Sequence, residues 1–234
     1  MDSSFTSSKA VRLCGPTLQG GHGNFCAFVA GPYKTATSLL AARLEASGFV
    51  NPASIEGSTE RGYGRRVTRY RTRESKTVRK LNEKILTNAF SSPLPKQIVY
   101  SSSLRWKREI ASYLESFHVP IVIKDPLFCS TLPVWLELTY MVGFLPLVFL
   151  TFRPCGLVPA WKHAAYTRHL LRECPDLLDR MVCNSYQLVT YLNNARVPYC
   201  LADYRDLVYV QSNPWVHRVS FYEDAILNGR QLRV

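Results

Sequence analysis

Acidic residues are scarce in this chain of 234 residues, which has 17 Asp and Glu against 29 Lys and Arg. The formal net charge is therefore +12. Such a surplus attracts anions, including phosphates, sulfates, nucleic acids and acidic membrane surfaces, and it concerns partners more than fold. A surplus spread over solvated faces would give the same count. The composition favours an anionic ligand without identifying it.

Paired cysteine motifs are also missing. None of the seven cysteines forms a CxxC pair, and their number is odd. Several lie in apolar runs such as residues 26–29. These features favour buried, reduced thiols in a cytoplasmic protein and speak against a disulfide framework or a zinc site. We therefore predict no metal site.

The sequence has no clear membrane-spanning or secretory segment. Residues 1–9 are polar and Ser-rich, and they lack the apolar stretch of a signal peptide. The longest apolar run, residues 135–152, is interrupted by Glu137 and broken by Gly143 and Pro146. We expect this run to be the end of a buried helix followed by a core strand, with no membrane span.

Short apolar runs alternate with helical patterns along most of the chain. Strands are expected at residues 26–30, 97–101, 120–123, 146–152 and 198–202. Helices are expected at residues 38–44, 74–90, 104–117, 132–144, 158–173, 177–194 and 215–227. This alternation is typical of a parallel sheet buried on both faces. The predicted fold is a three-layer, P-loop-type α/β domain with about five strands, and ligands at their carboxyl ends.

The chain divides into a short lead-in and one domain. Residues 1–24 are rich in Ser and Gly and are expected to be flexible, whereas residues 25–234 form the domain. Inside it, residues 51–75 contain six arginines and little apolar content. We interpret this segment as a mobile basic loop. It could clamp an anionic acceptor or close over a nucleotide, although a solvated loop is the default.

The turn between the first strand and the first helix has the chemistry of a phosphate-binding loop. It reads Gly31-Pro32-Tyr33-Lys34-Thr35-Ala36-Thr37-Ser38. A loop that leaves a strand and opens a helix directs backbone N–H groups at one point, where the helix dipole favours negative charge. Lys34 adds a positive charge, and three hydroxyls add donors. For this segment alone, an ordinary polar turn is the alternative.

The same turn resembles the phosphosulfate-binding loop of the sulfotransferase family, whose usual form is Pro-Lys/Arg-Ser-Gly-Thr-Thr/Ser. The matching residues are Lys34, Thr35 in place of Ser, Thr37 and Ser38. Ala36 replaces the family glycine, and its Cβ is expected to crowd the approach of the backbone to a phosphate.

Three further segments resemble that family and follow in the same order. Residues 121–126 with 132–135 look like the Lys-Asp-Pro strand end and the Leu-Pro-x-Trp helix of bacterial members. Residues 148–154 are similar to the strand that carries the arginine for the donor's 3′-phosphate, and residues 204–207 resemble Tyr-Glu-Asp-Leu. Trp161 stands where the family places a serine after that arginine, and the late Arg-Lys-Gly motif of eukaryotic cytosolic members is absent.

The resemblance implies metal-independent transfer of a sulfuryl group from 3′-phosphoadenosine 5′-phosphosulfate to a hydroxyl or amine. The acceptor would be a small molecule or a carbohydrate. The residues that would hold the donor are Tyr33, Lys34, Thr35, Ala36, Thr37, Ser38 and Arg153. Lys34 would neutralise the leaving phosphate, and the planar fork of Arg153 would take the 3′-phosphate.

A hydroxyl acceptor also needs a general base. Asp125 is the best candidate, and Lys124 would stabilise the oxygens of the transferring group. The two could instead be a structural pair, and Glu56, Glu60 and His22 are rival bases.

Two other functions fit parts of the sequence. One is a P-loop kinase, but the glycines of a Walker A loop would fall on Phe28 and Tyr33. The other is a catalytically silent protein that binds nucleotide or nucleic acid, which Ala36, Trp161 and the +12 charge favour. The acceptor and the oligomeric state are not predicted.

Overall fold

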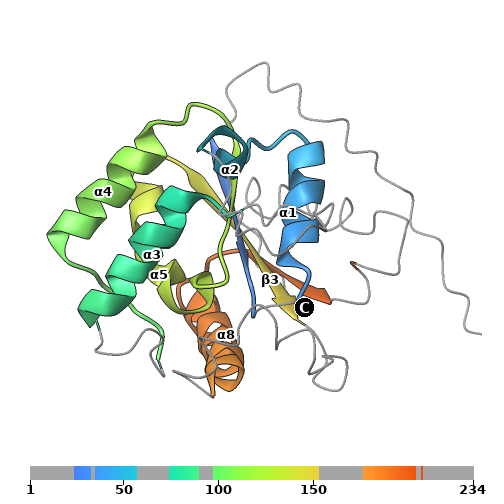
Figure 1. The fold of residues 1–234 in the computed structure, drawn as a ribbon, viewed down its shortest axis with the longest axis vertical. Helices are drawn as coiled ribbons and strands as arrows, with labels where there is room; N and C mark the ends of the chain where they lie inside the picture. Colours follow the sequence, from blue (N-terminus) through green and yellow to red (C-terminus); the bar gives the residue numbers. More distant parts are fainter. Residues whose placement is uncertain are drawn as a thin grey trace, which may run out of the picture.

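The centre of the protein is a four-stranded parallel sheet flanked by helices, seen in a computed structural model (Figure 1). The structure describes residues 24–32, 35–56, 74–89, 97–152, 176–203 and 207. Its strands are β1 (Phe25–Ala30), β2 (Ile121–Lys124), β3 (Leu145–Phe152) and β4 (Tyr199–Asp203), in the order β2-β1-β3-β4. All three neighbouring pairs are parallel, so the carboxyl ends of the strands lie at one edge.

Helices cover both faces of this sheet and give the domain three layers (Figure 1). One face packs against α1 (Thr37–Ala46); the other packs against α3 (Lys76–Ala89), α4 (Leu104–Glu115), α5 (Phe128–Met141) and α8 (Leu177–Asn194). Along β1, Cys26 and Phe28 enter the core of the larger layer, whereas Ala27 and Val29 pack towards α1. Burial on both faces explains why the strands are continuous apolar runs.

The expected α/β class and parallel sheet are confirmed, but the strand count is four within the described residues. The strand expected at residues 97–101 is wrong, because residues 98–101 are irregular. The Val99 N–H donates to the Ser130 carbonyl at 2.7 Å, and the Ile98 N–H donates to Gln187 Oε1 at 3.2 Å. These apolar residues are therefore buried against α5 and α8, and their backbone groups bond to those helices in place of a strand.

The segment expected to be a mobile loop, residues 51–75, contains a short helix. This helix is α2 (Pro52–Glu56), and residues 57–73 lie outside the described part of the chain. The Ala53 N–H donates to Asn51 Oδ1 at 3.0 Å, and proline stands at the first helical position. Asn before Pro is a recognised helix start, so this signal was present in the sequence.

The long apolar run at residues 135–152 divides as expected into the end of α5 and strand β3. Helix α5 begins at Phe128, four residues before the expected start, and Pro133 lies inside it. No helix in the described ranges is long and apolar enough to cross a membrane. The helices expected at residues 158–173 and 215–227 lie outside the described residues.

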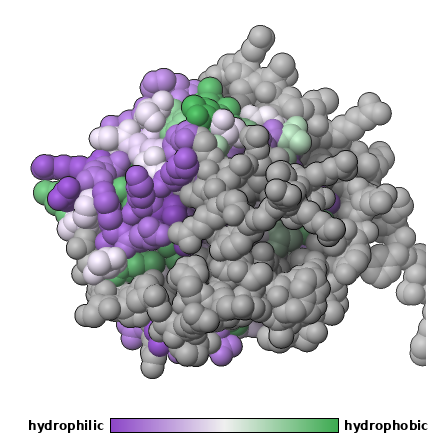
Figure 2. Space-filling model, in the orientation of Figure 1, coloured by the Kyte–Doolittle hydropathy of each residue, from purple (hydrophilic) through white to green (hydrophobic). Residues whose placement is uncertain are grey.

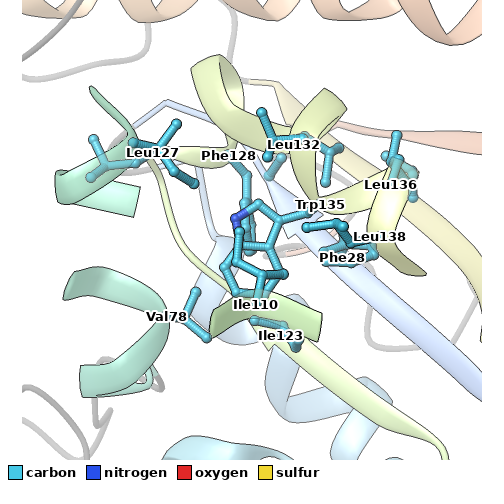
Figure 3. Packing of buried hydrophobic residues seen from close by; sticks show 14 of the residues in the cluster. Phe28, Val78, Ile110, Ile123, Leu127, Phe128, Leu132, Trp135, Leu136 and Leu138 are labelled. Atoms are coloured by element: carbon cyan, nitrogen blue, oxygen red, sulfur yellow. The ribbon is translucent and has the colours of Figure 1, made fainter. Parts of the chain in front are cut away.

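Trp135, from the Leu-Pro-x-Trp motif, is the centre of the larger core (Figure 3). Its ring meets Phe28 of β1 and Phe128 of α5 edge-on, at centroid distances of 6.3 and 5.5 Å. Its indole N–H donates to Asn82 Oδ1 at 2.8 Å, so the buried polar atom is satisfied. This residue joins the sheet to α3 and α5, which carry residues of the candidate site.

Candidate functional site

The candidate site lies at the carboxyl ends of β1 and β2, which are neighbours in the sheet. Val29 of β1 pairs with Lys124 of β2 in the register of the two strands. The β1–α1 turn (residues 31–36) and Asp125 therefore leave the sheet beside each other. In open α/β sheets, ligands bind outside the carboxyl ends of the strands.

Gly31 starts the β1–α1 turn and packs directly against the end of β3. A Cβ added at Gly31 would lie 2.1 Å from Thr151 Oγ1 and 2.9 Å from Thr35 Oγ1. The Thr35 hydroxyl donates to the Pro32 carbonyl at 2.7 Å and lies 2.6 Å from Thr151 Oγ1. These contacts join Thr35 to Pro32 and to β3, and the Thr35 side chain is buried. Thr35 was expected to hold phosphate, whereas its hydroxyl here bonds to the turn itself and to β3.

Ala36 caps α1 in a left-handed conformation, with φ 68° and ψ 21°. An L-residue with a Cβ pays about 1–2 kcal/mol for this conformation, and glycine does not. Ala36, the position compared with the glycine of the sulfotransferase loop, thus has a backbone conformation that favours glycine in this chain. The Ala36 side chain is compatible with that backbone, but at a cost.

The remaining loop residues begin α1. Thr37 is buried and Ser38 is partly exposed in the first turn of the helix, which contains no acidic residue. Ala36 makes no side-chain cap, so backbone N–H groups at this end are not satisfied by a capping side chain. Tyr33 and Lys34, between the two described parts of the turn, lie outside the described residues.

Four buried or partly buried charges, Glu74, Arg79, Lys124 and Asp125, form a charged cluster at the end of β2. The Lys124 ammonium pairs with the Glu74 carboxylate, and both side chains are almost completely buried. Arg79 Nη1 lies 3.4 Å from Asp125 Oδ1. The cluster thus balances two cations against two carboxylates. Lys124 and Asp125, expected to act together or as a structural pair, each have a partner on or next to α3.

Asp125 is fully buried and only partly satisfied. Its Oδ1 accepts the Leu127 N–H at 2.7 Å, but its Oδ2 has no hydrogen-bond partner within the described part of the chain. Burial raises the pKa of the carboxyl from 3.8 to about 6, while the Arg79 charge lowers it and the Glu74 charge raises it. A carboxyl in this range can exchange a proton near neutral pH.

Cys129, in the first turn of α5, connects the two strand ends. Burial raises the pKa of its thiol to about 11, and hydrogen bonds from Ser185 and from the Gly31 backbone lower it. The Asp125 charge raises it. Gly31 and Asp125 therefore both lie near the buried sulfur of Cys129. Among the described cysteines, Cys26, Cys129 and Cys200 are buried, whereas Cys183 is exposed.

Several expected site residues lie outside the described residues, namely Lys34, Arg153, Trp161, Glu60, His22 and residues 204–206. Among the rival bases, Glu56 is described; its Oε2 accepts the Ser75 hydroxyl at 2.6 Å. Glu74 and Arg79 were not singled out from the sequence. No local pattern marks them, because they reach Lys124 and Asp125 only when α3 packs beside β2.

Comparisons with protein-family models and with curated proteins gave no match to this sequence. The site combines a helix N-terminus after a left-handed residue, which suits an anion, with a buried carboxyl whose pKa lies near neutrality. Together these features suit the binding of a phosphorylated ligand and the removal of a proton beside it.

Proposed function

We propose that the protein binds 3′-phosphoadenosine 5′-phosphosulfate at the β1–α1 turn and transfers its sulfuryl group to a hydroxyl or amine of a small-molecule or carbohydrate acceptor. The observation that supports this most is Asp125, a buried carboxyl with an unpartnered oxygen and a pKa near 6, beside that turn. The ordered sequence motifs, from Lys34 to residues 204–207, supply the choice of donor.

In the proposed reaction the acceptor oxygen attacks the sulfur of the donor. A new S–O bond forms, and the S–O bond to the 5′-phosphate oxygen breaks. Adenosine 3′,5′-bisphosphate leaves with the electron pair of the broken bond. The acceptor proton passes to Asp125, which is largely ionised at neutral pH because its pKa is about 6.

The protein's other groups stabilise charge in this scheme. Lys34 and the first N–H groups of α1 hold the leaving phosphate, and Arg153 holds the 3′-phosphate. The ion pair with Glu74 favours a structural role for Lys124 over direct contact with the sulfuryl oxygens. Its charge nevertheless helps to lower the pKa of Asp125.

The first test is calorimetric binding of adenosine 3′,5′-bisphosphate in magnesium-free buffer. We expect wild type to bind, and Lys34→Ala and Arg153→Ala to bind at least roughly tenfold more weakly, because each loses a charge-assisted contact to phosphate. Lys107→Ala is the matched control: it removes one positive charge from a surface pair with Glu137 and should bind like wild type.

The alternatives give different results in the same assay. Binding of ATP with magnesium, without binding of the bisphosphate, would indicate a P-loop kinase. Failure to bind either nucleotide would leave a silent fold. Asp125→Asn separates binding from chemistry, since it should keep bisphosphate affinity and lose roughly 10²–10⁴-fold in transfer rate.

A further inference from the structure

The outer surface of α3 and α4 is strongly basic. The two helices contain seven Lys and Arg and only three Glu. We call Lys76, Lys80, Lys84, Arg105 and Arg108 the basic face. Hydrophilic residues gather over these two helices in the space-filling view (Figure 2). These two helices therefore carry part of the +12 charge surplus of the whole chain.

Some of these cations have no ion-pair partner among the described residues. Lys84 and Arg105 share Glu109, both at 3.3 Å. Lys76, Lys80 and Arg108 are exposed, and none of them makes an ion pair with any residue that the structure describes. Unpaired surface cations close to one another attract a polyanion and release its counterions on binding.

The basic face begins at the candidate site. Glu74, two residues before Lys76, pairs with Lys124, and Arg79 reaches Asp125 at 3.4 Å. Lys76, Lys80 and Lys84 follow at intervals of four residues, so they lie on one side of α3 and are about 6 Å apart along its axis. A chain of anionic groups lying along α3 would therefore pass Arg79, whose guanidinium contacts the buried Asp125.

We infer that the basic face binds an acidic polysaccharide, and that this polymer is the acceptor class of the reaction proposed above, on which the inference rests. The carboxylates or sulfates of such a chain complement the row of lysines. Its hydroxyls are the groups that a sulfuryl transfer needs.

The surroundings of the cations favour this partner over two others. Proteins that hold single-stranded nucleic acid stack bases on exposed aromatic rings. The only indole on these helices, Trp106, is 9% exposed and lies under Lys84 and Arg105, at 4.4 and 4.7 Å from its ring centroid. A helix that lies in a membrane surface buries a row of exposed apolar residues beside its cations. In the described part of the two helices only Leu104 is a large exposed apolar residue.

The test compares two double variants of the full chain that carry the same net charge. Lys76→Gln with Lys80→Gln removes two cations from the basic face. Arg180→Gln with Arg196→Gln removes two cations from α8 and the residues after it. Heparin-derived oligosaccharide is the probe, titrated at several salt concentrations. We expect the first variant to bind roughly tenfold more weakly, with a salt slope smaller by about two, and the second to bind like wild type.

Equal weakening in both variants would overturn the inference, since it would show an effect of net charge alone. Tighter binding of single-stranded DNA than of heparin carrying the same charge would also overturn it and indicate a nucleic-acid surface. Equal urea midpoints for the two variants confirm that both are folded.

A second arm separates this inference from the proposed function. With desulfated heparin as acceptor, Lys76→Gln with Lys80→Gln should raise KM without changing the affinity for adenosine 3′,5′-bisphosphate. An unchanged KM in a protein that binds the bisphosphate would overturn the acceptor assignment alone. Failure of wild type to bind the bisphosphate would instead overturn the proposed function.

Discussion

The ends of β1 and β2 are neighbours at one edge of the sheet, but they are built differently. The β1–α1 turn is held by backbone geometry and hydroxyls, through Gly31, Thr35 and the left-handed Ala36. The end of β2 is held by buried charges that pair with α3, including Lys124 with Glu74. The end of β1 is thus stabilised by close packing and hydroxyl contacts, and the end of β2 by buried ion pairs.

This difference matters for the proposed chemistry. The described residues of the β1–α1 turn carry no charge, so an anion can bind there without breaking an internal ion pair. In the charged cluster every cation already faces a carboxylate, and an incoming anion would have to compete. This difference is consistent with the proposed reaction, in which the donor binds at the first region and the proton is transferred at the second.

The largest expected effect tests whether charge holds the end of β2. Lys124→Met should destabilise the protein by about 4 kcal/mol, because it removes the buried cation that faces the Glu74 carboxylate. Urea unfolding at neutral pH measures the change. Lys107→Met is the control: its pair with Glu137 is partly exposed, and its loss should cost less than about 1 kcal/mol.

A double variant sharpens this result. Lys124→Met with Glu74→Leu removes both charges and should recover most of the loss, because an apolar pair of similar volume needs no partner. If the double variant is as unstable as Lys124→Met alone, loss of the Lys124 charge beside Glu74 is not the cause.

The next effect tests whether close packing at Gly31 stabilises the end of β1. Gly31→Ala should destabilise the protein by about 3 kcal/mol, because the new Cβ would lie 2.1 Å from Thr151 Oγ1. Gly143→Ala is the control, with φ +81° and open space around the Cβ. It should cost only about 1 kcal/mol, from backbone strain. Equal losses in the two variants would contradict the role of close packing.

The third effect is a pH dependence caused by Asp125. Its pKa is raised from 3.8 to about 6, so the folded state binds this proton more tightly than the unfolded chain does. The stabilisation is fully present below about pH 4 and is lost as the pH rises through 6, by up to about 3 kcal/mol. Asp125→Asn removes this contribution. Its stability relative to wild type should rise between these pH values, and a constant difference would contradict the shift.

The smallest effect concerns the strain at Ala36. Ala36→Gly should stabilise the protein by about 1 kcal/mol, because glycine adopts φ 68° without strain. Arg196→Gly is a matched comparison after α8, where φ is 56°. Thermal unfolding should show a similar gain for both. A loss in Ala36→Gly would mean that the alanine methyl contributes packing that outweighs the strain.

Local sequence signals predicted most of the regular elements. The apolar runs identified the four strands, and helical spacing identified α1, α3, α4 and α8 close to their observed bounds. The run at residues 97–101 was misassigned because burial against α5 and α8 produces the same short apolar pattern as burial in a sheet. Asn51 and Pro52 mark the start of α2, whereas the polar, Arg-rich composition of residues 51–75 as a whole favours a loop.

Only part of the candidate site could be predicted from the sequence. A strand, a polar turn and a helix in succession predicted the β1–α1 turn, and the end of a strand predicted the position of Asp125. The sequence by itself determined the parallel α/β class and this edge as the place for a site, because periodicity and strand ends are local properties. Only the tertiary structure decided that Glu74 and Arg79 pair with Lys124 and Asp125. Long-range packing sets which charges are buried together, and burial, in turn, sets the pKa of Asp125.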